Sequence, residues 1–169
     1  PALELALVEE SVVEGGVATL QATASDPLPL TWAWDFGDGT VDAVQSAQRQ
    51  HRYVQDGSYV ARVTVTALDG DSAQAEVLVT VSNGAPTVTL DAVQGREGSP
   101  VAFVARAADP GALDLLSYAW SFGDGQTATT DIPTVTHTYG NDGAYDVSVS
   151  VSDGTLSGNA TARATVSNV

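Results

Sequence analysis

The sequence predicts an all-β protein made of two tandem β-sandwich domains, residues 1–83 and 84–169. Three observations support this fold class: an internal repeat, a hydrophobic alternation of period two, and turn residues between the alternating segments. The phrase WDFGDGT at residues 34–40 returns as WSFGDGQ at residues 120–126, which is 86 positions later. No stretch carries the apolar stripe of a helix.

The repeat extends over nearly the whole chain. EGGVATLQATASDP at 14–27 matches EGSPVAFVARAADP at 97–110 with an offset of 83, and HRYVQDGSY at 51–59 matches HTYGNDGAY at 137–145 with an offset of 86. The second copy therefore carries a three-residue insertion, in PGALDLLS. We place the boundary at SNGAP, because Asn-Gly and Ala-Pro pairs interrupt regular structure. The chain is expected to be a slice of a longer array.

Within each copy the alternation is that of β-strands. SYVARVTVTA places Ala61, Val63 and Val65 on one face and polar side chains on the other, and AYDVSVSVS repeats the pattern. Alternating Val and Thr bounded by Gly, Asp and Asn are typical of antiparallel strands. About seven short strands in a copy fit an immunoglobulin-like β-sandwich.

The repeated WxFGDG phrase is interpreted as a core strand and its exit turn. Trp34 and Phe36 share one face, and the two glycines permit a positive φ in the turn. Asp38 is expected to accept hydrogen bonds from the turn backbone. The alternative is an acid pair of Asp35 and Asp38, as in a glycosidase. It is disfavoured because Asp35 is replaced by Ser121 in the second copy.

The downstream residues also have a structural interpretation. DGSY and DGAY resemble a tyrosine corner, and His51 and His137 are interpreted as structural hydrogen-bonding residues. Of the aromatic residues, only Tyr53 and Tyr139 are expected to be free to contact a ligand. No nucleophile elbow, HExxH motif or phosphate loop accompanies the histidines, so the sequence predicts no enzyme.

Charge and composition exclude several functions. The chain has 21 acidic residues against six arginines and no lysine, for a net charge of -15. This charge disfavours binding to nucleic-acid phosphates and to anionic membrane surfaces. Cysteine is absent, which excludes disulfides and thiolate metal sites, and no apolar run is long enough for membrane insertion.

With WDFGDGT followed by HRYVQDGSYVARVTV, and YAWSFGDGQ followed by HTYGNDGAYDVSVSVSDG, both copies resemble the PKD (polycystic kidney disease) repeat family. The resemblance covers essentially the whole chain. It implies immunoglobulin-like sandwiches in an extracellular or cell-surface protein. Such modules are implied to space, stiffen or bind beside neighbouring repeats of the same protein, and not to catalyse.

The resemblance also implies calcium as a cofactor, since some family members hold it near the linker. The implied metal ligands are Asn83, Asp109 and Asp153 in the second copy, and Asp26 and Asp69 in the first. A further loop carboxylate of the family is missing from both copies, where Leu28 and Gly111 stand, and Asp114 is the substitute offered by the second copy. The alternative is that these residues only form turns. Both interpretations stay open.

Two functions remain open. The first is a non-catalytic structural or adhesive module, a rigid spacer or rod segment that calcium stiffens, with self-assembly through exposed edge strands as one way to join subunits. The second is an accessory module of a secreted hydrolase that binds an extracellular protein or polysaccharide. Exposed aromatic rows would favour the second function, but most aromatics lie on expected core faces.

Overall fold

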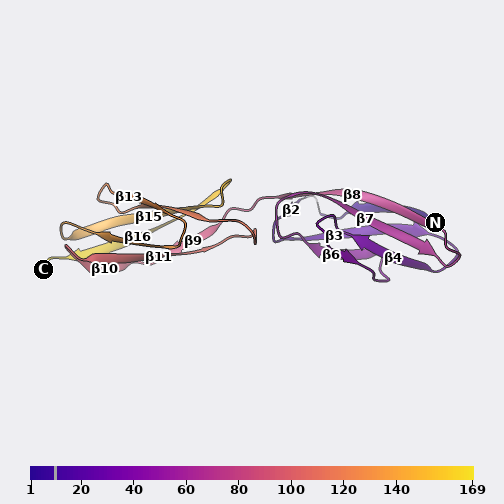
Figure 1. Ribbon diagram of the computed structural model, residues 1–169, viewed down its shortest axis with the longest axis horizontal. Coiled ribbons are helices and arrows are strands. Elements are labelled where there is room, and N and C mark those ends of the chain that lie inside the picture. The colour runs from indigo at the N-terminus through magenta and orange to yellow at the C-terminus, as the bar shows by residue number, and fades with distance from the viewer. Residues whose placement is uncertain (10) are drawn as a thin grey trace. The chain divides into compact units, whose positions relative to one another are not determined.

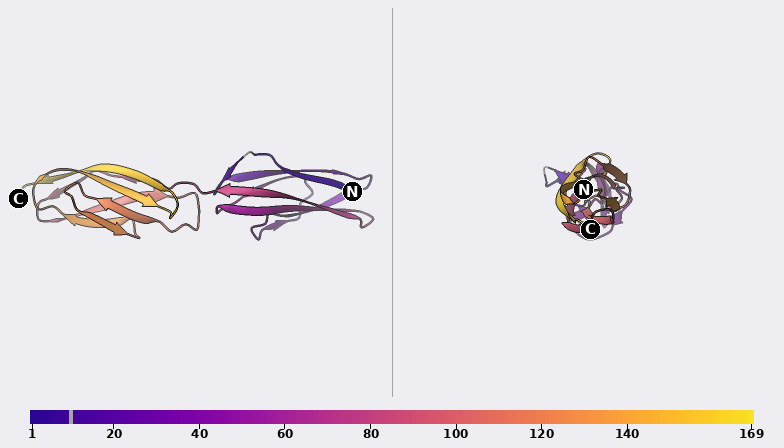
Figure 2. Two further views of the ribbon diagram at one scale, coloured as in Figure 1. Left: turned by 90° about the horizontal axis from the view of Figure 1, so that it is seen from above. Right: turned by 90° about the vertical axis from the view of Figure 1, so that its left-hand side faces the viewer.

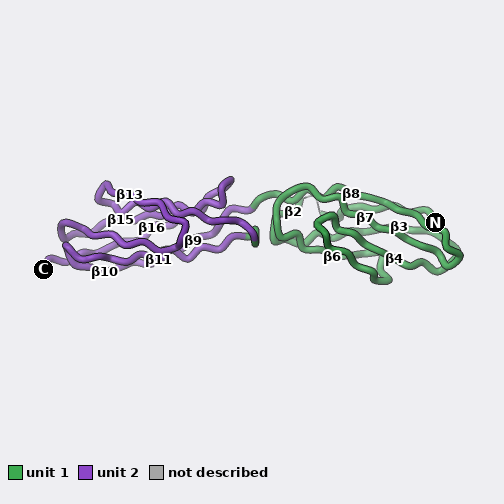
Figure 3. Tube along the Cα trace, in the orientation of Figure 1, with its two compact units in different colours: residues 1–83, 110–112 green, residues 84–109, 113–169 purple. Residues whose placement is uncertain are grey.

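The computed structural model of the chain describes residues 1–9 and 11–169, and the described residues form strands joined by turns and loops, with no helix. The chain divides into two compact units, residues 1–83 with 110–112 and residues 84–109 with 113–169 (Figure 3). The all-β prediction is confirmed. The described residues therefore also contain no helix suited to crossing a membrane.

Unit 1 consists of two facing sheets, and Figure 1 labels β2, β3, β4, β6, β7 and β8 among their strands. The three-stranded sheet has the order β1-β3-β6, and the five-stranded sheet has the order β2-β8-β7-β4-β5. The strands are β1 (Ala2–Leu7), β2 (Val12–Val13), β3 (Val17–Ser25), β4 (Leu30–Asp35), β5 (Val41–Asp42), β6 (Gln48–Arg52), β7 (Gly57–Ala67) and β8 (Ser72–Ser82).

Unit 2, which runs from pink through orange to yellow in Figure 2, repeats this arrangement. Its sheets have the orders β14-β11-β9 and β10-β16-β15-β12-β13. Its strands are β9 (Thr87–Leu90), β10 (Val93–Arg96), β11 (Pro100–Ala108), β12 (Ser117–Ser121), β13 (Thr127–Thr130), β14 (Thr134–Thr138), β15 (Gly143–Ser152) and β16 (Ser157–Ser167). Each strand of unit 2 thus has a counterpart in unit 1, in the same sheet position.

The first segment of each copy divides between the two sheets, which the sequence pattern did not reveal. In unit 1, β1 pairs with β3 in one sheet, and β2 then pairs in parallel with β8 in the other. In unit 2, β9 and β10 do the same with β11 and β16. A segment that changes sheets buries side chains of each half against a different layer. Within the described residues, each unit consequently has eight strands, against the seven or so expected from the sequence.

The cores lie where the alternation predicted. In unit 1, Ala61, Val63 and Val65 of β7 are fully buried together with Trp34 and Phe36 of the β4 segment. In unit 2, the corresponding side chains of β15 surround Trp120 and Phe122. A buried aromatic side chain of this size is worth several kcal/mol to a small domain. The tryptophans therefore contribute strongly to the stability of each sandwich.

Candidate functional site

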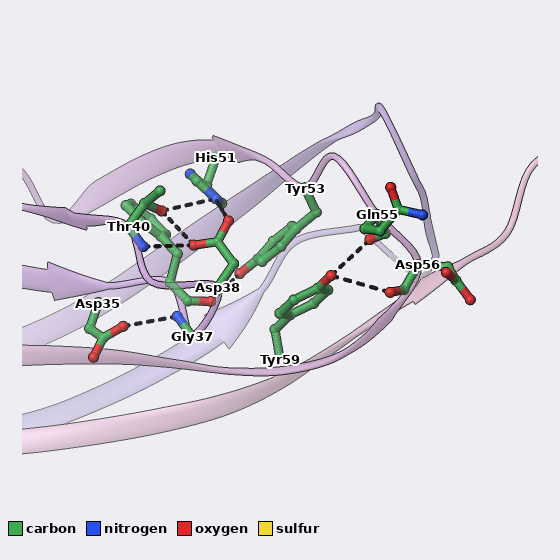
Figure 4. Close-up of polar contacts among 10 residues, drawn as sticks. Asp35, Gly37, Asp38, Thr40, His51, Tyr53, Gln55, Asp56 and Tyr59 are labelled. Atoms are coloured by element: carbon green, nitrogen blue, oxygen red, sulfur yellow. Dashed lines mark hydrogen bonds and ion pairs between the residues drawn. The ribbon is translucent and has the colours of Figure 1, made fainter. Parts of the chain in front are cut away.

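A set of interacting polar side chains in unit 1 lies at the turn that follows β4 (Figure 4). His51 Nε2, on β6, lies 2.6 Å from Asp38 Oδ2 in the turn. Thr40 donates its backbone N–H to Asp38 Oδ1 at 3.0 Å and its hydroxyl to the same oxygen at 2.6 Å. Asp38 thus ties the turn to β6, which belongs to the other sheet. We call Asp38 and His51, with their unit 2 counterparts Asp124 and His137, the Asp–His clamps.

The turn depends on two glycines with positive φ. Gly37 has φ of 82° and Gly39 has φ of 93°. At Gly37 a Cβ would stand 2.6 Å from the carbonyl oxygen of Val60 on β7, so the close approach of two backbones also excludes a side chain there. This confirms the prediction that the GDG phrase forms an exit turn.

The His51 ring belongs to a row of aromatic rings in contact with one another. The His51 ring stacks on Phe36 with centroids 4.1 Å apart and meets Tyr53 edge-on at 4.7 Å. Tyr53 in turn stacks on Tyr59 at 4.6 Å. The Tyr53 hydroxyl donates to the Phe36 carbonyl at 2.8 Å, so Tyr53 is also bound to the backbone at the start of the turn.

Tyr59 lies near the start of β7 and behaves as the sequence predicted. Its hydroxyl reaches back to the carbonyl oxygens of Gln55 at 3.0 Å and Asp56 at 3.2 Å, as in a tyrosine corner (Figure 4). In unit 2 the Tyr145 hydroxyl donates to the Asn141 carbonyl at 3.0 Å. The corner therefore recurs at the equivalent place.

Unit 2 builds the same clamp from the same residue types. His137 Nε2 lies 2.7 Å from Asp124 Oδ2, and the His137 ring stacks on Phe122 with centroids 4.0 Å apart. The Tyr139 hydroxyl donates to the Phe122 carbonyl at 3.0 Å. The clamps differ in one contact. Thr40 bonds Asp38 through both its backbone N–H and its hydroxyl, whereas its counterpart Gln126 contributes its backbone N–H, at 3.0 Å from Asp124 Oδ1.

Hydrogen bonding sets the charge of the clamp carboxylates. Burial raises the pKa of Asp124, but bonds from His137 and the Gln126 amide outweigh burial and hold that pKa below its ordinary value. The pKa of Asp38 is likewise lowered, since bonds from Thr40 and His51 outweigh its burial. Both carboxylates are consequently ionised at neutral pH.

The tyrosines shift in the opposite direction. Burial, with the nearby negative charge of Asp124, raises the pKa of the Tyr139 phenol to about 12. Burial and the charge of Asp38 also raise the pKa of Tyr53. These hydroxyls are neutral donors over the physiological range.

The clamp is arranged for structure and not for nucleophilic catalysis. An ionised carboxylate only accepts hydrogen bonds, so Nε2 of His51 carries the proton that it shares with Asp38. Thr40 Oγ lies 3.3 Å from that same nitrogen, which is therefore not available as a base for the hydroxyl. Asp35 bonds the Gly37 amide at 2.9 Å and points away from Asp38 (Figure 4). No acid pair forms.

One expectation about the aromatic residues is wrong. The sequence predicts that Tyr53 and Tyr139 are free to contact a ligand, but both side chains are fully buried. Each tyrosine follows the end of its strand, where the alternation of period two no longer indicates whether a side chain points into the core. Each hydroxyl is bound to a carbonyl of the WxFGDG segment. They therefore offer no stacking surface for a sugar.

A glutamate that binds the backbone in each copy, buried in unit 1 and partly buried in unit 2, was not recognised from the sequence. Glu14 is 2% exposed, and its carboxylate accepts the backbone N–H of Asp56 at 3.1 Å. Its counterpart Glu97 accepts the N–H of Asp142 at 3.0 Å. The signal was available in the matched EGG and EGS triplets. A charged residue repeated beside glycine between two strands predicts a backbone-binding role.

Two of the predicted metal ligands, Asp109 and Asp114, lie close together. In unit 2, carboxylate oxygens of Asp109 and Asp114 come within 4.8 Å of each other, and both residues are partly buried. Asp153 Oδ1 accepts the N–H groups of Thr155 and Leu156, both at 2.6 Å, so it forms a turn. Asn83 closes the sequence range of unit 1 directly after β8.

The two predicted ligands of the first copy also bind their own loops. Asp26 accepts the Leu28 N–H at 2.9 Å and lies 3.1 Å from the Pro1 nitrogen. Asp69 accepts the Asp71 N–H at 3.2 Å in the β7–β8 turn. These bonds are those of turn-forming residues, and a metal role for them stays a prediction.

Comparison with known proteins supplies independent findings. A family model described as "PKD domain" matches residues 1–81 and 83–168. A microbial collagenase of Vibrio alginolyticus is 43% identical over 75 residues, covering 43% of this chain and 9% of that protein. Human polycystin-1 is 32% identical over 119 residues, covering 67% of this chain and 3% of that protein. The chain thus spans a small part of these relatives.

Among the solved structures, the match to Dscam1 bears on the fold. The N-terminal four immunoglobulin domains of a Dscam1 isoform match with a TM-score of 0.56 and 17% identity, over 96% of this chain and 45% of that one. The PKD1 domain of the Vibrio cholerae metalloprotease PrtV is 28% identical over 48% of this chain and 99% of that one, with a TM-score of 0.41. The predicted immunoglobulin-like architecture is confirmed.

Proposed function

Because the chain belongs to the PKD domain family and carries one such domain in each of its two copies, we propose that it is a non-catalytic structural module, a spacer or rod segment of an extracellular or cell-surface protein. The observation that carries this proposal is the use of the polar residues. In both copies the acids, histidines and tyrosines of the repeated motifs bind the turns and the opposite sheet of their own unit.

A spacer requires a stiff joint between its domains, and residual dipolar couplings test this directly. Couplings measured for backbone amides of both units should fit a single alignment tensor if the joint is stiff. Two different tensors, with a reduced order for one unit, would contradict the spacer role and indicate a flexible tether. The 17.3 kDa mass of the chain suits this measurement.

We further propose that calcium contributes to the stiffness. Asp109 and Asp114 bring carboxylate oxygens within 4.8 Å of each other, and such oxygens are the ligands that calcium prefers. Calcium would add positive charge between acids that otherwise repel. Calcium bound only by the folded state raises stability by about 2.7 kcal/mol at a concentration 100 times its dissociation constant.

The calcium proposal is tested by thermal unfolding in millimolar calcium and in chelator. We expect a higher midpoint in calcium and no shift in a D109A variant. D131A, at an exposed acid of unit 2, is the control and should keep the shift. Identical curves for the unmodified chain in both conditions would leave Asp109 and Asp114 as turn and solubility residues.

A second candidate function rests on the collagenase match. We propose, as the alternative, an accessory module that binds an extracellular protein or polysaccharide beside a secreted hydrolase. A binding assay of the chain against collagen fibrils and insoluble polysaccharides distinguishes the two. Saturable binding by the folded chain supports the accessory role, and its absence for every such ligand favours the spacer.

A further inference from the structure

One edge of the five-stranded sheet of unit 1 is covered by a shorter partner strand than the same edge in unit 2. β5 pairs with β4 only at Trp34 and Asp35, whereas β13 pairs with β12 from Ser121 back to Tyr118. In the part of the chain that the structure describes, no strand pairs with the side of β4 facing away from β7 over residues 30–33. We call this side the open β4 edge.

The backbone groups that point toward the open β4 edge follow from the register. Phe36 donates its N–H to the Thr40 carbonyl at 3.1 Å, and Trp34 lies opposite Asp42. Because bonded residues alternate along an antiparallel strand, Trp32 presents its N–H and C=O on the same side. Its unit 2 counterpart Tyr118 lies opposite Thr130 of β13. Trp32 therefore has the bonding position of Tyr118 without the strand.

The difference arises from the path of the connection and not from its length. Ala47 and Pro133 stand at equivalent positions, and their carbonyls accept the N–H groups of Ala22 at 2.8 Å and Ala105 at 2.9 Å on the opposite sheet. Between these fixed points unit 1 leaves β4 after Asp42. Unit 2 stays paired two residues longer before it crosses.

A groove adjoins the open β4 edge. It has a volume of about 550 Å³ and lies on the outer face of the sheet, with small side chains at Ala33, Ala43 and Thr64 and a 75% exposed valine at position 41. An extended segment laid along the edge would turn every second side chain toward this face. The groove has room for side chains of β-branched size.

Charge identifies the kind of segment that fits. The net charge of -15 reflects 21 acids against six arginines. Four of these arginines, at positions 49, 62, 106 and 163, already form ion pairs with acids of their own unit. A second copy would bring the same charge and be repelled. A cationic segment would be attracted before contact.

We propose that the open β4 edge binds an extended, positively charged peptide segment of a partner protein, which adds a strand beside Trp32 and places alternate side chains over the groove. Main-chain hydrogen bonds supply affinity in this mode, and the groove selects side-chain size. This binding role goes beyond the spacer function proposed above and does not depend on it.

The test uses the whole chain and a synthetic peptide of alternating valine and lysine. We expect saturable changes in amide chemical shift at Trp32 and Ala33, with none at Tyr118, and amide hydrogen exchange at Trp32 slowed about tenfold or more on binding. A peptide with glutamate in place of lysine should bind at least about tenfold more weakly.

An edge-closing variant provides the matched control. A43T/V44T copies the residues of β13 that pair with β12, and it keeps Asp42 and its ion pair with Arg49. Slowed exchange at Trp32 without peptide shows that β5 has been extended. That variant should lose at least about tenfold in peptide affinity.

Several results would overturn the proposal. They are exchange at Trp32 that the peptide leaves unchanged in the unmodified chain, shift changes spread over the acidic surface of both units, and equal binding of the glutamate peptide. A dimer of the chain alone that protects Trp32 would show that the occupant is a second copy and would equally refute the cationic partner.

Discussion

The Asp–His clamp of unit 2 can be tested by replacing Asp124 with asparagine. The substitution keeps the shape and an oxygen for the Gln126 amide, but it removes the charge that His137 binds at 2.7 Å. Charge-assisted hydrogen bonds of this kind contribute about 1.5–3 kcal/mol. Because Asp124 retains 16% side-chain exposure, we expect a loss of about 1–2 kcal/mol at pH 7. This corresponds to a midpoint lower by roughly 4–16 °C for a domain of this size.

The loss should depend on pH in a defined direction. The pKa of Asp124 is lowered in the folded state, so its contribution is complete above the unfolded pKa of about 4 and disappears as pH falls through the lower folded value. The difference between the unmodified chain and D124N should therefore still be present at pH 5 and shrink below pH 4. Urea unfolding followed by amide exchange measures this difference in stability for unit 2 separately from unit 1.

A double-mutant cycle separates the pair from general damage to the turn. H137F keeps the stack on Phe122, whose centroid lies 4.0 Å from that of His137, and removes only the polar partner. We expect a coupling energy of about 1 kcal/mol between D124N and H137F at pH 7. Additive losses, or a D124N effect that is the same at pH 3 and pH 7, would refute the clamp.

Other substitutions test the surrounding contacts. Tyr139→Phe should cost about 1–2 kcal/mol, because it leaves the buried Phe122 carbonyl without its donor, and the partly exposed Tyr145→Phe should cost less in the same urea titration. Since burial raises the folded pKa of Tyr139 to about 12, its neutral form stabilises unit 2 below pH 10, and this contribution should be lost as pH rises from 10 to 12, except in Y139F. Gly123→Ala should cost more than Gly125→Ala in thermal unfolding, since both have positive φ but only the Gly123 Cβ would lie 2.6 Å from a backbone oxygen. Equal costs would contradict the close approach at Gly123.

Local sequence patterns were sufficient to predict the exit turns and the inward face of β7. Glycine is the residue for positive φ, and an aspartate beside it binds nearby amides, so the GDG turn and the role of Asp38 followed from residue types alone. The facing of β7 followed equally from its period of two. These features depend on a few consecutive residues.

The burial of Tyr53 and the binding of Glu14 did not follow from local pattern. Each side chain reaches a backbone group far along the chain, at Phe36 in one case and Asp56 in the other. Such partners are set by how the two sheets stack. A connecting segment has no regular alternation, so its sequence does not indicate whether a polar side chain points into the core or toward solvent.

By itself the sequence determined the two-copy organisation, the strand character, the exit turns and the acidic charge of this protein, because repeats, alternation and glycine placement express local backbone preferences. Only the tertiary structure decided that His51 binds Asp38, that Tyr53 is buried, and that β4 has an open edge which β12 lacks. The two connections have equal length and differ in path. That path is chosen by packing and hydrogen bonding across both sheets, which no short stretch of sequence encodes.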